Sequence, residues 1–173
     1  QAYMTDYTLE LEFDVNQVTR GLQYKFTSPD GSPEVPQGAL AGTYHFSAGD
    51  TLGFKLTATG KTSDDIGVSV TDCTIISIGT SSIGKFDLSP FSKESAASKI
   101  DHWGPPSPSE TEPGRMKVVI EGDMTLPILA ENGQWKISGY LSAGLRIAGK
   151  SYNRLFYFDP EGSTGNGGGH SFP

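Results

Sequence analysis

The end of the chain carries oxygen-bearing side chains of the kind that bind calcium. Asp159, Glu161 and Asn166 lie in the run RLFYFDPEGSTGNGGG, where the glycines allow the backbone to bend. Calcium prefers carboxylate, amide and carbonyl oxygens, so these three residues are candidate ligands. The run lacks the repeated nonapeptide of glycine-rich calcium-binding proteins. We therefore favour the other interpretation, a strand that ends at Asp159 and continues into a Gly-rich tail over 159–173.

The sequence contains no recognised motif of a hydrolase. The histidines are His45, His102 and His170, and none belongs to an H-E-x-x-H or H-x-H pattern. No G-x-S-x-G nucleophile elbow is present. Cys73 has no neighbour in sequence that marks it as a nucleophile, and a buried structural cysteine is the better interpretation. We predict that the protein is not an enzyme, with a hydrolase of unrecognised type, assembled only in space, as an open alternative.

Two pairs of acids could serve glycoside hydrolysis. Asp64 and Asp65 are adjacent, and Glu121 and Asp123 flank Gly122. Carboxylates about 5–9 Å apart can carry out this reaction. Both pairs fall in expected turns of an acidic chain, where carboxylates are usually solvated, so we do not assign them a catalytic role.

Three aromatic residues are candidates for binding a ligand. Trp103 lies in IDHWGPP, outside any strand pattern, while Tyr152 and Tyr157 belong to the last aromatic run. Aromatic rings stack on sugars and anchor protein partners. These residues support an alternative function as a carbohydrate-binding module, with calcium near Asp159 as an optional ligand. Trp103 has a second interpretation, in which it covers the end of the core beneath its own loop.

The elements that must position these residues are strands, because apolar residues recur at every second position. In YTLELEFDV, Leu9, Leu11 and Phe13 share one face, and the segment from Trp135 to Ile147 alternates in the same way. The pattern predicts eight to ten short strands and no amphipathic helix. We predict an all-β, single-domain antiparallel β-sandwich over 1–173, immunoglobulin-like or jelly-roll.

One segment departs from this alternation. Residues 89–114 are rich in proline and serine, and their few apolar side chains have no period. We expect a long excursion from the sandwich over this segment. Within it, Lys93 to Ile100 suggests one or two helical turns.

Composition excludes several classes of partner. The net charge is −7 and no cluster of basic residues occurs, which argues against nucleic acid. No run of 18 apolar residues is present, so no membrane span is expected. A single cysteine cannot form an intrachain disulfide, which favours the cytoplasm over secretion. A secretory segment removed before Gln1 stays open as an alternative.

The chain resembles the AidA/PixA inclusion-body proteins of proteobacteria in several short stretches. These are GTYHFSAGDTLGFKLTATG, VTDCTIISIG, WKISGYLSAGLRIAG and LFYFDP, with matching residues Gly49, Asp50, Phe54, Phe158, Asp159 and Pro160. The opening YTLELEFDV and the glycine-rich tail depart from that family. The resemblance implies a non-catalytic β-sandwich that accumulates in cells and acts by self-association or partner binding. It supplies no catalytic residues.

Overall fold

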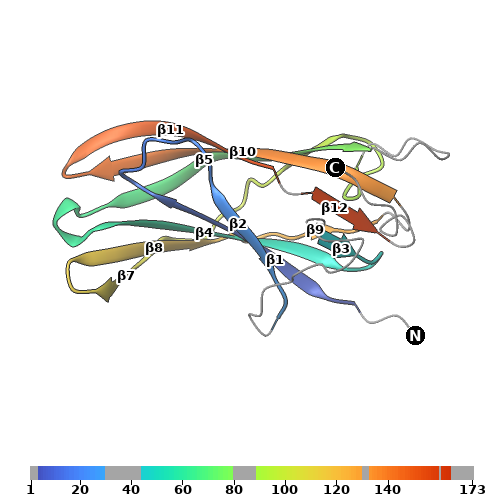
Figure 1. The fold of residues 1–173 in the computed structure, drawn as a ribbon, viewed down its shortest axis with the longest axis horizontal. Helices are drawn as coiled ribbons and strands as arrows, with labels where there is room; N and C mark the ends of the chain where they lie inside the picture. The colour runs from blue at the N-terminus through green and yellow to red at the C-terminus, as the bar shows by residue number, and fades with distance from the viewer. Residues whose placement is uncertain (1–3, 30–43, 80–88, 130–132, 160, 165–173) are drawn as a thin grey trace.

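The protein is built from two β-sheets. The computed structural model describes residues 4–29, 44–79, 89–129, 133–159 and 161–164, which contain twelve strands and one short 3-10 turn, η2 (Thr62–Asp64). The sheets lie in two layers (Figure 1). The expected all-β sandwich is confirmed. Within the described ranges, no helix is long and apolar enough to cross a membrane.

The first sheet, which we call sheet A, has the strand order β2-β1-β4-β8-β7, with β9 beside the start of β4. Pairs β1·β2, β4·β8 and β7·β8 are antiparallel, whereas β1 and β4 run parallel. The strands are β1 (Asp6–Asp14), β2 (Gln23–Thr27), β4 (Thr51–Lys61), β7 (Ser107–Glu112), β8 (Arg115–Glu121) and β9 (Leu126–Pro127).

The second sheet, sheet B, has the order β3-β12-β10-β5-β6, and β11 also pairs with β10. The long strand β10 therefore pairs with β5 along one edge, and with β12 and then β11 along the other. The strands are β3 (Tyr44–Phe46), β5 (Gly67–Gly79), β6 (Ala97–Lys99), β10 (Gly133–Ile147), β11 (Lys150–Phe158) and β12 (Glu161–Thr164).

The proline- and serine-rich segment 89–114 contains two strands, β6 and β7. The expected helical turns over Lys93 to Ile100 are wrong. Ser92 accepts hydrogen bonds through its Oγ from the backbone N–H groups of Glu94 and Ser95, which bends the chain there. Ala97–Lys99 then pairs with Thr74–Ile76 of β5. The sheet edge supplies backbone partners that a short polar helix in this segment would lack.

Backbone hydrogen bonds fix two of the places where the chain meets the other sheet or crosses to it. Before β2, Leu22 N–H donates to Tyr157 O of β11 at 2.9 Å, and Tyr157 N–H donates to Arg20 O at 2.8 Å. After β6, Trp103 forms a bridge with Gly122 beside β8. Because both crossings are hydrogen-bonded, the two sheets are fixed relative to each other on both sides.

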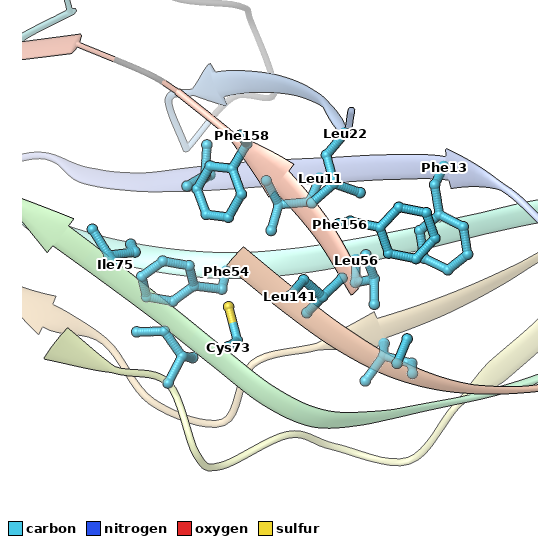
Figure 2. Packing of buried hydrophobic residues seen from close by; sticks show 14 of the residues in the cluster. Leu11, Phe13, Leu22, Phe54, Leu56, Cys73, Ile75, Leu141, Phe156 and Phe158 are labelled. Atoms are coloured by element: carbon cyan, nitrogen blue, oxygen red, sulfur yellow. The ribbon is translucent and has the colours of Figure 1, made fainter. Parts of the chain in front are cut away.

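The core fills the space between the layers. Leu9, Leu11 and Phe13 of β1 point inward, as their alternation predicts, and Phe13 stacks on Phe156 with ring centroids 4.3 Å apart. Figure 2 shows these side chains converging from both sheets. Trp135, which the alternation also places inward, is only 4% exposed. Gly139 lies beneath the ring of Phe158, where a methyl group would collide with it, so this position requires glycine.

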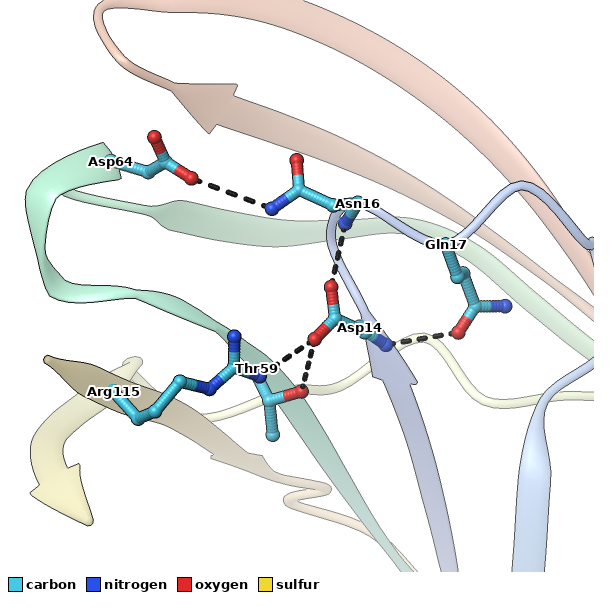
Figure 3. A network of polar contacts seen from close by, with 6 residues as sticks. All are labelled: Asp14, Asn16, Gln17, Thr59, Asp64 and Arg115. Atoms are coloured by element: carbon cyan, nitrogen blue, oxygen red, sulfur yellow. Dashed lines mark hydrogen bonds and ion pairs between the residues drawn. The ribbon is translucent and has the colours of Figure 1, made fainter. Parts of the chain in front are cut away.

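A polar network joins three strands of sheet A (Figure 3). Asp14, at the end of β1, accepts hydrogen bonds from Arg115 Nη2 at 2.7 Å, from Thr59 Oγ1 at 3.2 Å and from the Asn16 N–H at 2.8 Å. Partial burial raises the pKa of this carboxyl. The hydrogen bonds from Arg115, Asn16 and Thr59, together with the charge of Arg115, outweigh that effect and hold the pKa below its ordinary value.

We predict that Asp14→Asn lowers the denaturation midpoint at pH 7. A carboxylate with a depressed pKa in the folded state stabilises the fold above its unfolded pKa of about 4, and this stabilisation is lost as the pH falls through the folded value. The difference between wild type and Asp14→Asn should therefore shrink below about pH 4. Urea titrations at pH 7 and pH 3 measure it, with Glu94→Gln as an exposed control. An equal difference at both pH values would contradict the prediction.

Candidate functional site

The two tyrosines predicted to bind a ligand lie on opposite faces of β11. Tyr157 is 48% exposed and points outward from sheet B, while Tyr152 is 47% exposed and pairs with the inward-facing Leu145. Tyr152 lines an open cleft between the sheets, where Val68 and Leu145 face Val118 and the two prolines Pro106 and Pro108; its volume is about 510 Å³. A single ligand therefore cannot stack on both tyrosines.

Trp103 is tied into the structure. Its Nε1 donates to Ile100 O at 3.0 Å, and its half-buried ring packs against the core. This geometry agrees with the interpretation that Trp103 covers the end of the core at the crossing after β6. Trp103 lies in the segment that leads from β6 in sheet B to β7 in sheet A, whereas Tyr157 lies in β11.

Tyr140 is a surface aromatic that the sequence analysis missed. It lies directly opposite Tyr157 in the register of β10 and β11. Thr74 of β5 and Lys99 of β6 continue the same row across sheet B. The alternation in WKISGYLSAG already placed Tyr140 on the outward face, but only strand pairing put it beside Tyr157. The outer face of sheet B therefore carries a tyrosine pair; in the same row Thr74 is buried and hydrogen-bonded to Asp72, and Lys99 is exposed.

The predicted calcium ligands are only partly described. Asp159 is exposed, and its backbone oxygen accepts a hydrogen bond from Tyr24 Oη at 3.2 Å. Glu161 begins β12, but its side chain and the whole of Asn166 lie outside the described residues. Among the side chains that are described, no group of three or more His, Cys, Asp or Glu residues is arranged to hold a metal ion. Calcium binding near Asp159 stays a prediction.

The histidine candidates for hydrolysis are also partly described. His102 Nδ1 lies 2.7 Å from Asp101 Oδ1, but the two side chains are 70% and 57% exposed and line neither groove found in the described part of the chain. The side chain of His45 and all of His170 lie outside that part. The described histidine therefore has an acid partner, and both side chains of the pair are largely in solvent.

The acid pair Glu121 and Asp123 lines a groove on the outer face of sheet A. The groove has a volume of about 620 Å³, and Glu10 and Lys55 stand beside Glu121 in its wall. Gly53 also lines it, and a Cβ at Gly53 would make only ordinary contacts. Lys55 Nζ lies 3.8 Å from Glu10 Oε1, so part of the acidic charge is neutralised. The groove is polar and open, which places these acids in solvent.

Gly49 and Asp50, the Gly-Asp pair that carries the family resemblance, stabilise a turn before β4. Asp50 is 3% exposed, and its carboxylate accepts hydrogen bonds from the N–H groups of Thr5 at 2.8 Å and Ser47 at 2.7 Å. Gly49 has a φ of +95°, which favours glycine. This pair fixes the connection between β3 and β4.

Comparisons with known proteins give a weak structural likeness. No family model matches the chain, and no curated protein matches it. Among solved structures, the chain is similar to an inclusion body protein, PixA, from Burkholderia cenocepacia J2315, with a TM-score of 0.42 and 9% identity over 95% of this chain and 97% of the other. The faint resemblance expected from the sequence is thus also present in the structure. A likeness this weak carries no argument about function.

We predict that Cys73 is chemically inert in the folded protein. It is fully buried opposite Leu141, and burial raises the pKa of its thiol to about 12, with a smaller contribution from the charge of Asp72. Only the thiolate is a good nucleophile. Ellman's reagent at pH 8 should therefore leave the native protein unmodified and modify one thiol after denaturation in guanidinium. Rapid modification of the native protein would restore Cys73 as a candidate nucleophile.

Proposed function

We propose that this chain is a non-catalytic β-sandwich protein that acts through its surface, by self-association or by binding a partner. The observation that carries the proposal is that both outer faces are open. Outward-facing residues of β1, β4, β8 and β10 are at least partly exposed wherever their side chains are described. The inward residues are mostly apolar side chains packed together, so most of the polar and charged groups that could contact a partner lie on the outer faces.

The chemistry of these faces supports contact with other molecules. Sheet A presents threonines and charges, and sheet B presents the pair Tyr140 and Tyr157 on rigid, hydrogen-bonded strands. Tyrosine supplies contact area at low entropic cost, which is why it is common at interfaces. Accumulation in inclusion bodies belongs to the same proposal and is supported by the resemblance in sequence alone. Within the described residues, the exposed His102–Asp101 pair gives no support to the hydrolase alternative.

Sedimentation velocity at increasing concentration tests the self-association part. We expect the weight-average sedimentation coefficient to rise with concentration over the micromolar to millimolar range, because interfaces at the small end of the size range are weak. A coefficient that stays at the monomer value at every concentration would remove self-association and leave partner binding.

A second candidate function is carbohydrate binding, and the Tyr140–Tyr157 pair favours it. Two rings on adjacent strands offer a platform for a pyranose ring, and the exposed Lys99, at the end of the same row, can bind hydroxyl groups.

A glycan array tests this candidate. Wild type should bind a glycan, Tyr157→Ala should lose at least about tenfold in affinity, and Tyr152→Ala, on the opposite face, should bind as wild type does. Repeating the array in the presence of a calcium chelator tests the predicted calcium site near Asp159. No binding by wild type with or without calcium would eliminate this function.

A further inference from the structure

Four charged residues form a straight row across the outer face of sheet A. In the strand register, Lys25 of β2 lies opposite Glu10 of β1, Glu10 lies opposite Lys55 of β4, and Lys55 lies opposite Glu121 of β8. The signs therefore alternate plus, minus, plus, minus over four adjacent strands. We call this set the charge row.

All four side chains point away from the core. Glu10 lies between the buried Leu9 and Leu11, and Lys55 lies between the buried Phe54 and Leu56, so strand alternation directs both charges outward. Glu10 and Lys55 are 24% and 36% exposed, and the end residues Lys25 and Glu121 are exposed. Glu10, Lys55 and Glu121 line the open groove on this face, so a partner surface can reach the charge row from solvent.

The charges are only partly satisfied within one molecule. Lys55 and Glu10 form an ion pair at 3.8 Å. In the described part of the chain, neither Lys25 nor Glu121 takes part in an ion pair. The two ends of the row therefore retain charge that a second surface can meet.

An alternating row with an even number of charges is complementary to its own reverse. A two-fold axis parallel to the strands, passing between β1 and β4, places Lys25 opposite Glu121 of a second copy and Glu10 opposite Lys55 of that copy. All four contacts then join opposite charges, as an isologous interface requires. We propose that the outer face of sheet A is the surface through which two copies of this chain associate; this inference rests on the proposed self-association.

Neighbouring rows tolerate the same arrangement. The next row pairs Glu12 with Thr57 across β1 and β4, so the axis places Glu12 opposite Thr57 of the second copy. In the row after that, Asp14 pairs with Thr59 across β1 and β4, so the axis places Asp14 opposite Thr59 of the second copy. The operation therefore brings no like charges into contact along β1 and β4. An axis perpendicular to the strands would instead place every charge opposite itself.

The size of the face indicates a weak dimer. Strands β1, β2, β4 and β8 have 9, 5, 11 and 7 residues. At about 3.3 Å per residue and about 4.8 Å between strands, they present roughly 500 Å² per copy, or about 1,000 Å² in total. That total is at the lower end for a specific interface. The net charge of −7 on each copy also opposes association, so the local complementarity must exceed a general repulsion.

Charge reversal within the row tests the proposal by sedimentation velocity. Lys55→Glu creates two like-charge contacts at the centre of the interface and should weaken dimerisation at least about tenfold. The matched control is Lys150→Glu, which changes net charge equally at the exposed start of β11 in sheet B. It should dimerise like wild type. Far-ultraviolet circular dichroism and thermal melting confirm that each variant is folded.

The double variant Glu10→Lys/Lys55→Glu provides the decisive control. It has the wild-type net charge, and the two-fold axis again brings opposite charges together at all four contacts. Dimerisation should return to within about threefold of wild type, because the charge pairs that set the specificity of the interface are restored. In a mixture, fluorescently labelled wild type should not pair with the double variant, because two central contacts between them join like charges.

Each outcome is decisive. If wild type associates but Lys55→Glu and Lys150→Glu are indistinguishable, the sheet A interface is wrong while self-association stands. If the folded double variant stays as weak as Lys55→Glu, the two-fold pairing is wrong. If wild type is monomeric throughout, both the interface and the self-association part of the proposed function fail.

Discussion

The structure depends on the burial of one apolar face from each sheet against the other. Strand geometry sends successive side chains to opposite sides, so filling the space between the layers commits alternate residues to the core. Phe13 on Phe156 and Phe158 over Gly139 illustrate how closely this space is filled. The same constraint fixes the remaining residues on the outside. A partner that binds an outer face therefore contacts the side chains that take no part in the core.

The backbone crossings make these outer faces rigid enough to act as surfaces. Hydrogen bonds between Tyr157 and the chain at Arg20 and Leu22 hold β11 to the segment before β2. The bridge from Trp103 to Gly122 does the same after β6. The backbone of paired strands loses little further freedom on binding, which lowers the entropic cost of recognition.

The two faces differ in chemistry, and this difference suggests separate roles. Sheet A alternates charges across its strands, an arrangement that selects a partner by electrostatic complementarity. Sheet B presents tyrosines, an arrangement that suits stacking and hydrogen bonding. Under the two proposals above, one face of the sandwich would meet a second copy and the other would meet a different ligand.

The sequence by itself determined the secondary structure and the inward or outward direction of most side chains, because both follow from a local period of two. It determined that Leu9, Leu11 and Trp135 face the core, and it placed Glu10, Lys55 and Tyr140 outside. It could not determine which strands are neighbours. The parallel pairing of β1 with β4 joins residues 45 positions apart, and no local pattern encodes that register. Polar segments such as Ala97–Lys99 became strands only because an open sheet edge offered them partners. The charge row and the tyrosine pair therefore exist only in the tertiary structure, where strand order brings distant residues to the same level.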